Sequence, residues 1–401
     1  MSDLAATDNA KVNALALDIT SRVRGLLGLT DGFVPLHEPE FLGEEETLVL
    51  DCIRSGWVSS VGQYVDRFEA QIAEVCGTSH GVAVVNGTAA LEVALRVVGV
   101  MPGDEVLMPS LTFIATANAA HHLGAVPHFV DSEVRTLGLD PVALRAYLDT
   151  TADRCRGVTV NAQTGRRLAA LVPMHVFGHP ADMDSLAEVA RDFEISLVED
   201  AAESLGSTLA DRPCGSLARI AALSFNGNKI LTTGGGGALV TDDPDLAKRA
   251  KHLSTTAKVP HKWAFHHDEI GYNYRMPNLN AALGVAQLGQ LSTRLAQKRA
   301  LAKRYIDAFA GADGAEVFAE RPGTQANYWL NTLLLSPEMA AGRESVLEAL
   351  NSAGLMARPV WQPLHTLSIY AHCPCAPLPV TSDLACRIVN MPSSAKLGKV
   401  V

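Results

Sequence analysis

Apolar runs separated by helical patterns dominate the middle of the chain. Short runs rich in Val, Ile, Leu and Ala occupy residues 82–85, 105–109, 126–130, 170–176, 195–200, 220–225 and 237–241. Strands buried on both faces read as continuous apolar runs, and helical patterns between them are typical of crossover connections. The sequence therefore predicts an α/β fold with a mostly parallel central sheet and helices on both faces. Ligands of such sheets bind in the loops beyond the strand ends.

The pattern changes at both ends of the chain. Residues 12–27 carry one apolar stripe at helical spacing, which predicts an amphipathic helix packed against the body. A long helical pattern covers residues 279–309, and a strand, a helix and a strand are predicted over 326–335, 345–351 and 356–361. We divide the chain into an N-terminal helical extension, a large α/β domain, and a connecting helix with a smaller C-terminal α+β domain: residues 1–33, 34–280 and 281–401.

Composition and charge narrow the class of protein. The 401 residues are 48% hydrophobic and 19% charged, so a large core can form without disulfides or metals. The chain has 33 Lys and Arg against 43 Asp and Glu, and its formal net charge of −10 has the wrong sign for binding nucleic acid or an anionic membrane. It shows neither a secretory apolar segment nor the ~20 successive apolar residues that span a membrane, so we expect a cytoplasmic protein.

The cysteines and histidines do not form a metal motif. Seven cysteines are scattered along the chain, an odd number that does not suggest a disulfide framework and that fits a reducing compartment. The close pair, Cys373 and Cys375, has no second pair at finger spacing. The adjacent histidines at 121–122 and 266–267 do not share a face of a helix or strand, so neither pair is a natural bidentate site. We therefore expect no metal.

The segment from Leu223 to Gly237 (LSFNGNKILTTGGGG) is the most informative one. An apolar strand ends at Ser224, Lys229 lies in the following loop, and four glycines lead into the next strand. Four successive glycines indicate a place where the backbone takes positive φ or passes close to another group, with a plain hairpin turn as the alternative. The segment is not a P-loop, since the Gly-Lys-Ser/Thr ending is missing.

Two more strand ends carry polar groups. In residues 84–91 (VVNGTAAL) a strand runs into Gly87, Thr88 and a helix start, which is either an ordinary N-cap or a cradle for a phosphate. In residues 195–204 (ISLVEDAAES) Asp200 ends a buried strand, where a carboxylate needs a cationic or protonated partner. A loop lysine, an anion beside a ring nitrogen and an anion cradle are what pyridoxal phosphate requires.

Five motifs occur in order along the chain. They are N-G-T-A-A-L at 86–91, P-S-L-T-F-I-A-T-A-N at 109–118, E-D-A-A-E at 199–203, S-F-N-G-N-K-I-L-T-T-G-G-G-G at 224–237 and G-Y-N-Y-R-M at 271–276. This set resembles the DegT/DnrJ/EryC1/StrS sugar aminotransferases, which are fold type I pyridoxal-phosphate transferases. The resemblance covers about residues 34–401. It implies a transaminase that uses pyridoxal 5'-phosphate, bound in the large domain, with pyridoxamine phosphate as the intermediate form.

The resemblance also implies a role for each matching residue. Lys229 would form the Schiff base and move a proton between the substrate carbon and the cofactor, while Asp200 would pair with the pyridinium nitrogen and keep the ring protonated. These two are the predicted catalytic residues. The cofactor phosphate would be held by Gly87, Thr88 and Ser224.

Three further residues complete the cofactor site that the resemblance implies. Phe113 would stack on the pyridine ring, and Glu203 would lie near the phenolic oxygen. Glu203 stands where the family often has Gln or His, and an ionised carboxylate would repel a phenolate unless it were protonated or turned away. Asn273 would reach the phosphate bound by the other subunit, which implies a homodimer with shared active sites.

Three segments resemble a narrower group, the LegC-type aminotransferases: P-L-H-E-P at 35–39, S-G-W-V-S-S-V-G-Q-Y-V-D-R-F-E at 55–69 and R-P-V-W-Q-P-L-H at 358–365. The implied substrate is a nucleotide-linked 4-keto-6-deoxy sugar with a 2-acetamido group, aminated at C4 for legionaminic-type or related cell-surface sugars. Glutamate is the implied amino donor. The nucleotide, UDP or GDP, stays open.

Substrate contacts are expected from two regions. Trp57, Ser59 and Ser60 are candidates for binding the nucleotide, with interface packing as the alternative for Trp57, and His365 is a candidate for approaching the sugar. Three alternative functions are considered. A pyridoxamine-dependent sugar dehydratase would lack the Schiff-base lysine, whereas Lys229 is present. A non-catalytic sugar-nucleotide-binding or regulatory protein could share the fold, and a different ketosugar aminotransferase of the family stays open as well.

Overall fold

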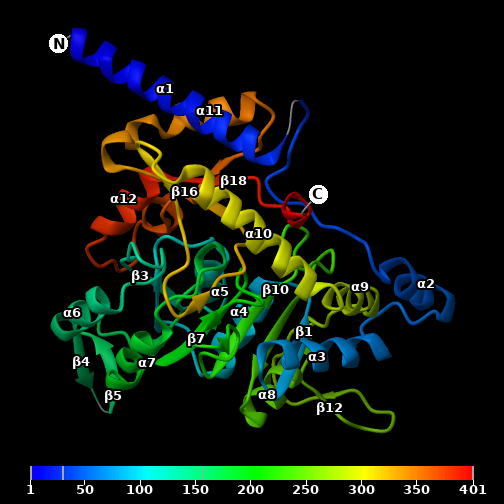
Figure 1. The fold of residues 1–401 in the computed structure, drawn as a ribbon. Coiled ribbons are helices and arrows are strands. Elements are labelled where there is room, and N and C mark those ends of the chain that lie inside the picture. The colour runs from blue at the N-terminus through cyan, green and yellow to red at the C-terminus, as the bar shows by residue number, and fades with distance from the viewer. Residues whose placement is uncertain (1, 29–30, 156, 400–401) are drawn as a thin grey trace.

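The computed structural model describes residues 2–28, 31–155 and 157–399, with side chains from residue 10 onward. Its centre is a seven-stranded sheet in the order β1-β11-β10-β7-β6-β2-β3 (Figure 1). The strands run parallel except for β11, which is antiparallel to both of its neighbours. Their bounds are β1 His80–Val84, β2 Glu105–Pro109, β3 Val126–Val130, β6 Leu168–Leu171, β7 Ser196–Asp200, β10 Ile220–Ser224 and β11 Gly237–Thr241.

Helices cover both faces of this sheet. In β1, Val82 and Val84 pack into one apolar cluster while Ala83 between them packs into another, as the two-residue period of a strand requires. The first cluster contains side chains of α4 (Gly87–Val97), α5 (Ala115–His122) and α8 (Pro244–Ser254). The opposite face is covered by α3 (Gln63–Cys76), α6 (Pro141–Thr151), α7 (Met183–Asp192) and α9 (Asn278–Leu288). The predicted α/β fold class is confirmed.

Strand positions follow the apolar runs closely, with one informative exception. The runs at 105–109, 126–130 and 237–241 coincide with β2, β3 and β11. The run at 170–176 is wrong at its end, since β6 stops at Leu171 and a 3₁₀ turn, η1 (Val176–Gly178), follows. Pro173 lies between them and has no N–H to donate, which interrupts the regular ladder, although its carbonyl accepts from Asp200 N at 3.0 Å and His175 N donates to the Asp200 carbonyl at 3.3 Å. The chain instead turns toward the end of β7.

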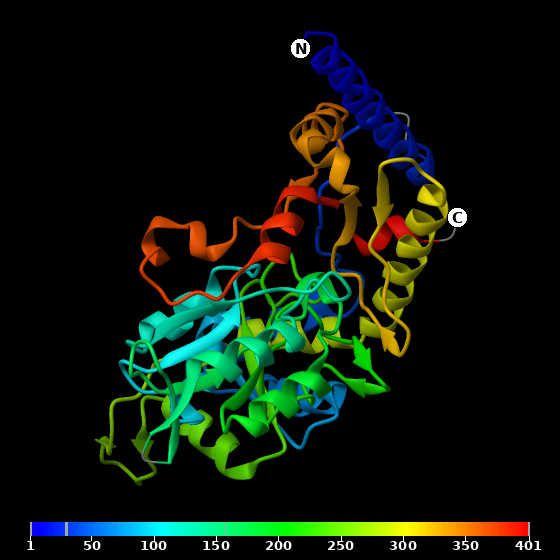
Figure 2. The same ribbon diagram turned by 90° about the vertical axis from the view of Figure 1, so that its left-hand side faces the viewer.

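The C-terminal part forms a second core. An antiparallel sheet in the order β14-β16-β18-β17 packs with helices and with the apolar stripe of α1 (Ser2–Leu27), where Leu15, Ile19 and Val23 are buried. Figures 1 and 2 both show α1 and this part above the seven-stranded sheet. The bounds are β14 Ala315–Val317, β16 Asn331–Leu335, β17 Arg358–Pro359, β18 Ile388–Met391, α10 Leu291–Phe309, α11 Arg343–Ser352 and α12 Pro379–Arg387.

The single helix predicted over residues 279–309 is two helices. The helix α9 ends at Leu288 and packs against α2 (Glu45–Ser55) and α3, whereas α10 begins at Leu291 and packs into the C-terminal core. Gly289 and Gln290 separate them, and Gln290 Nε2 donates to Glu45 Oε1 at 2.5 Å. The break lets one helical segment serve both cores.

The strand predicted from residue 326 begins only at Asn331, because the chain first turns inward. Tyr328 has a positive φ of 49°, and Asn327 Nδ2 donates to the carbonyls of Glu203 and Leu205 at 2.9 and 3.0 Å. These bonds tie the segment to the end of the central sheet. The turn delivers Trp329 to that same place.

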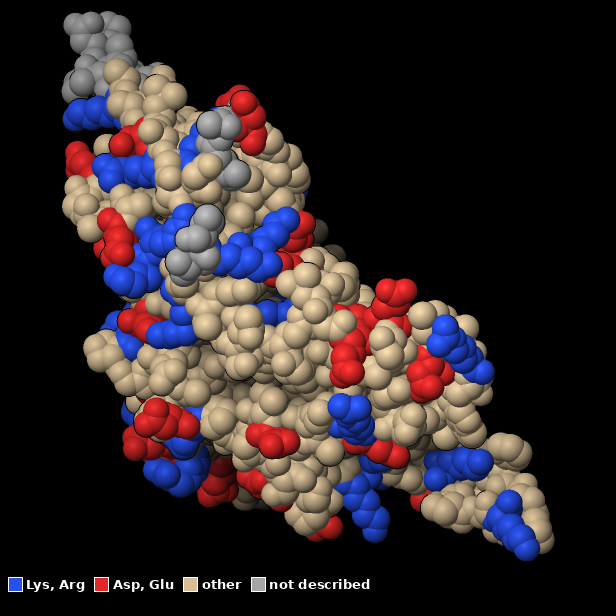
Figure 3. All heavy atoms as spheres, turned by 45° about the vertical axis from the view of Figure 1, so that its right-hand side comes forward, with Lys and Arg blue, Asp and Glu red and all other residues tan. Residues whose placement is uncertain are grey.

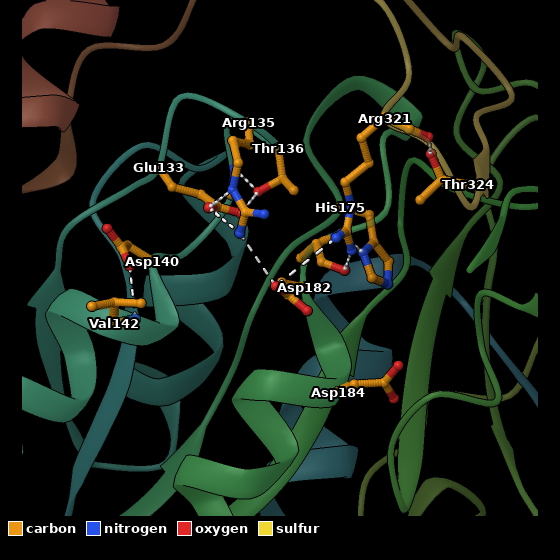
Figure 4. Close-up of polar contacts among 12 residues, drawn as sticks. Glu133, Arg135, Thr136, Asp140, Val142, His175, Asp182, Asp184, Arg321 and Thr324 are labelled. Atoms are coloured by element: carbon orange, nitrogen blue, oxygen red, sulfur yellow. Dashed lines mark hydrogen bonds and ion pairs between the residues drawn. The ribbon is translucent and has the colours of Figure 1, made fainter. Parts of the chain in front are cut away.

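A charged cluster joins the two parts beside this turn (Figure 4). Arg135 Nε donates to Glu133 Oε2 at 2.9 Å, and its Nη2 reaches Asp182 at 3.3 Å. Arg321, from the C-terminal part, lies 3.9 Å from the same Asp182 carboxylate and donates to the Ala181 carbonyl at 3.3 Å. Asp182 is thus shared between arginines from both parts.

Three properties of the whole molecule bear on the sequence expectations. All seven cysteines are free thiols. Basic and acidic side chains are interspersed over the face shown in Figure 3. Among the helices of the described residues, none has the length and apolar character needed to cross a membrane.

Candidate active site

One cavity of about 290 Å³ lies at the carboxyl ends of the central strands. Asp200 ends β7, Ser224 ends β10, and Gly87 follows β1. Seven of the eight residues predicted to bind the cofactor line this cavity: Gly87, Thr88, Phe113, Asp200, Glu203, Ser224 and Lys229. Residues far apart in the chain therefore meet at the edge where parallel sheets bind ligands.

The start of α4 forms a cradle for an anion. Asn86 caps the helix by accepting from Ala89 N at 2.8 Å, which leaves the first-turn N–H groups of Gly87 and Thr88 without an intrahelical acceptor. A Cβ on Gly87 would lie 2.8 Å from Ser224 Cβ, closer than such atoms approach. Glycine is needed here so that the helix start and the end of β10 can lie together beside the cavity.

The run of four glycines at 234–237 ends beside the same helix start. Gly234 has a positive φ of 78°, and a Cβ on Gly237 would lie 2.4 Å from the Asn86 carbonyl oxygen. The sequence allowed two interpretations of the four glycines. The close approach at Gly237 and the positive φ at Gly234 favour the first one, in which the backbone passes close to another group. A plain hairpin turn would not require glycine at position 237. The glycines let β11 pass directly under the helix start that carries Gly87.

Asp200 is a buried carboxylate without an ion pair among the described residues. It is 2% exposed, its Oδ2 accepts from Thr116 Oγ1 at 2.7 Å, and its Oδ1 accepts from Ala202 N at 3.2 Å. Burial raises the pKa of the Asp200 carboxyl, although Thr116, Ala202 and Lys229 oppose the rise. A carboxylate in this position favours a protonated nitrogen as its partner.

The neighbouring Glu199 points to the other side of the strand and is fully satisfied. Its carboxylate accepts from Gly215 N at 2.6 Å and Leu217 N at 2.9 Å, and His175 Nε2 lies 2.8 Å away. Because Ala181 N donates to His175 Nδ1, the Nε2 of His175 carries the proton that Glu199 accepts. This network fixes the end of β7 and so the position of Asp200.

The histidines that lie near other possible metal ligands are not the adjacent pairs considered in the sequence. Within the described part of the chain, two clusters have ligand atoms close together: His175 with Glu199 and Cys214, and His252 with Asp268 and Glu269. Neither contains the adjacent histidines at 121–122 or 266–267, which are all exposed. The first cluster is the hydrogen-bonded network just described.

Lys229 lies between a carboxylate and an aromatic ring. Its Nζ is 3.1 Å from Glu203 Oε1 and 3.9 Å from the centroid of the Trp329 ring, a cation–π arrangement. Trp329 Nε1 donates to the Asn228 carbonyl at 2.6 Å and so holds the loop that carries the lysine. The Lys229 side chain is 12% exposed, which leaves it reachable from the cavity.

Aromatic side chains form one wall of the cavity. Phe113 is half exposed, and its ring lies 6.4 Å from that of Trp361, which in turn lies 5.0 Å from Phe177. Phe113 therefore has an open face for stacking on a planar ring. Phe177 is buried and packs against Trp361, which lines the cavity.

Three of the residues that line the cavity and that the sequence did not single out contact the predicted site residues. Thr116 lies inside the motif at 109–118 but gave no separate signal, although a hydroxyl one helical turn after Phe113 could have suggested a contact. Trp329 fell in a predicted strand, and Trp361 at the end of another. Both tryptophans belong to the C-terminal part of the chain and reach the cavity only because the two parts pack together. No local sequence pattern could therefore place them there.

Five predicted residues do not line this cavity. Asn273 is exposed and pairs with Thr255 at the base of a projecting hairpin. Trp57 is 59% exposed, and the carbonyls of its loop hold Asn278. His365 Nδ1 lies 2.8 Å from Ser110 Oγ. The five are Trp57, Ser59, Ser60, Asn273 and His365.

The residues present fit pyridoxal phosphate. A buried carboxylate without a cation suits a pyridinium nitrogen, the glycine cradle at a helix start suits a phosphate, and an accessible lysine suits a covalent bond to the aldehyde. Lys229, Asp200 and the group Gly87, Thr88 and Ser224 would hold the cofactor at these three points.

Comparisons with known proteins agree with this chemistry. The model of the DegT/DnrJ/EryC1/StrS aminotransferase family matches residues 40–400. The chain is 36% identical to the GDP-perosamine synthase of Caulobacter vibrioides over 91% of this chain and 94% of that one. It is 36% identical to the putative pyridoxal phosphate-dependent aminotransferase EpsN of Bacillus subtilis, covering 84% and 83%.

Solved structures give the same result. The aminotransferase TlmJ of Streptoalloteichus hindustanus superposes with a TM-score of 0.81 at 29% identity, covering 90% of this chain and 94% of that one. DesI, solved in the presence of its TDP-sugar product, superposes with a TM-score of 0.79 at 30% identity, covering 90% and 88%. The chain belongs to the DegT/DnrJ/EryC1/StrS aminotransferase family and is a pyridoxal-phosphate-dependent sugar aminotransferase.

Proposed function

We propose that the protein aminates C4 of a nucleotide-linked 4-keto-6-deoxy sugar that carries a 2-acetamido group, with glutamate as amino donor, in the cytoplasm. The observation that carries this is the convergence of Lys229, Asp200 and the Gly87 cradle in one cavity. Support for a nucleotide-linked sugar as substrate comes from relatives that are named after nucleotide-linked amino sugars. One of them is the GDP-perosamine synthase. The LegC-type segments at 35–39, 55–69 and 358–365 favour the acetamido sugar.

Each side chain has a definite task in this proposal. When bound, the cofactor supplies an electron sink for the carbon that loses or gains a proton. The Lys229 amine holds that proton and moves it across a short gap, because its flexible stem ends inside the cavity. Asp200 keeps a proton on the ring nitrogen, and Thr116 orients the Asp200 carboxylate. Phe113 would stack on the planar ring of the cofactor from the aromatic wall that it shares with Trp361.

We extend the proposal to the division of labour along the chain. Residues 34–280 would be the cofactor-binding domain, and residues 281–401 the smaller domain that supplies Trp329 and Trp361. Residues 1–33 would be an extension that supports the C-terminal core through α1. His365 would approach the sugar from the segment that follows Trp361.

The substrate is identified by an amination assay over a panel of sugars. We expect turnover with a UDP- or GDP-linked 4-keto-6-deoxy sugar and glutamate, and much weaker turnover with the matching 3-keto sugars. The 3-keto arm is needed because one relative, 30% identical, is named as a 3-aminotransferase acting on a UDP-N-acetyl-3-dehydro sugar. Product analysis by mass spectrometry and NMR gives the aminated carbon. Preference for a 3-keto substrate would refute the C4 assignment.

We further propose a homodimer in which each site uses residues from both copies. Asn273 lies outside the cavity of its own chain, beside the hairpin formed by β12 (Lys258–Val259) and β13 (His266–His267). Figures 1 and 2 both show this hairpin projecting from the body. The hairpin and the residues just after it expose large apolar side chains that favour burial against a second copy: Trp263 at 73%, Phe265 at 82% and Ile270 at 91%.

Mixing an inactive variant with a weakened one tests the shared site. Asn273→Ala should weaken cofactor retention and activity without unfolding, since one phosphate donor is lost. Mixed with Lys229→Ala under exchanging conditions, it should form heterodimers in which one of the two sites has both residues. Equal mixing should restore about a quarter of the wild-type activity. Proven heterodimers without recovery, or a fully active monomer, would contradict the shared site.

A further inference from the structure

Glu203 occupies the centre of the cavity wall and contacts the reactive lysine directly. It is 3% exposed; its Oε1 lies 3.1 Å from Lys229 Nζ and its Oε2 accepts from Phe177 N at 3.0 Å. Sequence reasoning placed Glu203 near the phenolic oxygen of the cofactor and left open how an ionised carboxylate could be tolerated there. The observed partners offer an answer.

The surroundings of this pair bring the pKa of the Glu203 carboxyl close to neutral pH, so that its charged and neutral forms are both accessible. Burial raises the pKa of the Glu203 carboxyl to about 7, opposed by Lys229 and the Phe177 N–H, while the Asp200 carboxylate adds to the rise. On its other side, Lys229 borders a small cavity. Three basic groups and two carboxylates line it: His37, Arg294, Lys298, Glu38 and Glu40. Burial and the cationic neighbours lower the pKa of His37, which therefore adds no charge there at neutral pH.

We propose that Glu203 takes up the proton that Lys229 gives up when its amine becomes covalently engaged, and returns it when the amine is released. One proton passes from the Lys229 ammonium to Glu203 Oε1, so that an ion pair becomes two neutral groups and the net charge of the pair stays zero. The neutral amine would then form a C–N bond to the aldehyde carbon of the cofactor, and the aldehyde oxygen would leave as water with the two hydrogens that remain on the nitrogen. The transfer needs no solvent proton, which suits a carboxylate that is 3% exposed and a lysine side chain that is 12% exposed. The inference rests on the role of Lys229 as the lysine that carries the cofactor.

The geometry supports a balanced exchange. A buried ion pair in contact distance and its neutral counterpart differ little in free energy, because the Coulomb attraction offsets the cost of removing both charges from water. The Trp329 ring, 3.9 Å from Nζ, stabilises the ammonium state. Once protonated, Glu203 donates rather than repels, which removes the conflict with a phenolate oxygen.

A purely structural role is the competing explanation. Phe177 has a positive φ of 54°, and the hydrogen bond from its N–H to Glu203 holds that turn. Glu203→Gln separates the two roles, because the amide oxygen still accepts from Phe177 while the charge and the proton site are lost. Glu203→Ala removes both. Glu92→Gln, a buried carboxylate on α4 without contact to Lys229, is the matched charge control.

The first experiment uses the cofactor-free protein and measures acylation of Lys229 by acetic anhydride against pH, read by mass spectrometry. Loss of the carboxylate 3.1 Å away should make the amine reactive at lower pH, with labelling at least about tenfold faster near pH 7 in Glu203→Gln. Wild type and Glu92→Gln should agree. An unchanged profile in Glu203→Gln would overturn the proposal.

The second experiment adds pyridoxal phosphate and records the infrared difference spectrum. A protonated-carboxyl band should appear in wild type and be missing in Glu203→Gln. Borohydride trapping, run in parallel, reports whether the cofactor is attached to Lys229. Trapping without the band would overturn the proton transfer alone, whereas no trapping at Lys229 would instead refute the assigned role of the lysine.

Discussion

Replacing Lys229 by alanine should lower the rate of amination by about 10⁴-fold or more, because in the proposed mechanism Lys229 is both the covalent attachment point and the group that moves the proton. The fold should persist. The Lys229 side chain lies in the cavity and is not part of an apolar core. Its Nζ contacts the Glu203 carboxylate and the face of Trp329. Single-turnover amination, together with borohydride trapping and thermal unfolding, measures each part of this result.

A matched lysine controls for the loss of charge. Lys303 is 75% exposed on α10 and pairs with Asp307 one turn away, so Lys303→Ala should keep full activity and trapping. In Lys229→Ala a buried carboxylate loses its cationic partner, and a modest fall in melting temperature is therefore expected. Near-normal turnover in Lys229→Ala would show that another amine does the chemistry.

The central sheet could be predicted because its strands are buried on both faces. Such strands are continuous apolar runs, so β2, β3 and β11 were located to the residue. Predictions failed where a tertiary contact overrides the local pattern. The run at 326–335 becomes a strand only at Asn331, because Asn327 is bonded to carbonyls beyond β7 that are distant in sequence. The sequence of the segment itself does not indicate which distant carbonyls it will contact.

The helical pattern over residues 279–309 failed for a related reason. Its composition favours a helix throughout, yet the segment must serve two cores whose directions differ, and it breaks at Gly289 and Gln290. The amphipathic stripe of α1 was predictable, because a stripe of Leu15, Ile19 and Val23 must be covered by something. That its partner would be the C-terminal core was not.

The cavity divides into a part that local motifs predict and a part that they do not. Lys229, Asp200 and Gly87 lie at strand ends, where the sequence itself marks a loop, a buried carboxylate or a helix start. Trp329 and Trp361 reach the cavity from the C-terminal part, and their roles depend on how the two parts pack. The proposed contact of Asn273 with a cofactor phosphate would need a second copy of the chain, which one chain cannot place.

Asp200→Asn should lower amination by about a thousandfold or more while leaving the fold intact. An amide is neutral, so it cannot hold a proton on the ring nitrogen by charge, and the electron sink fails. The local structure should survive, because the Asn Oδ1 can still accept from Ala202 N and its Nδ2 can donate to the Thr116 hydroxyl. The loss is therefore one of charge rather than of shape.

Thr116→Val is the matched comparison for this variant. It keeps the volume of the side chain but removes the hydroxyl that orients the carboxylate, so we expect about a tenfold loss, much smaller than that of Asp200→Asn. The rates come from single-turnover amination at saturating cofactor, and the absorbance spectrum of the bound cofactor reports the protonation of its ring. In Asp200→Asn the spectrum should change together with the rate. Activity within a few-fold of wild type, or an unchanged spectrum, would mean that another acid protonates the ring, and Asp200 would then serve only to close the end of β7.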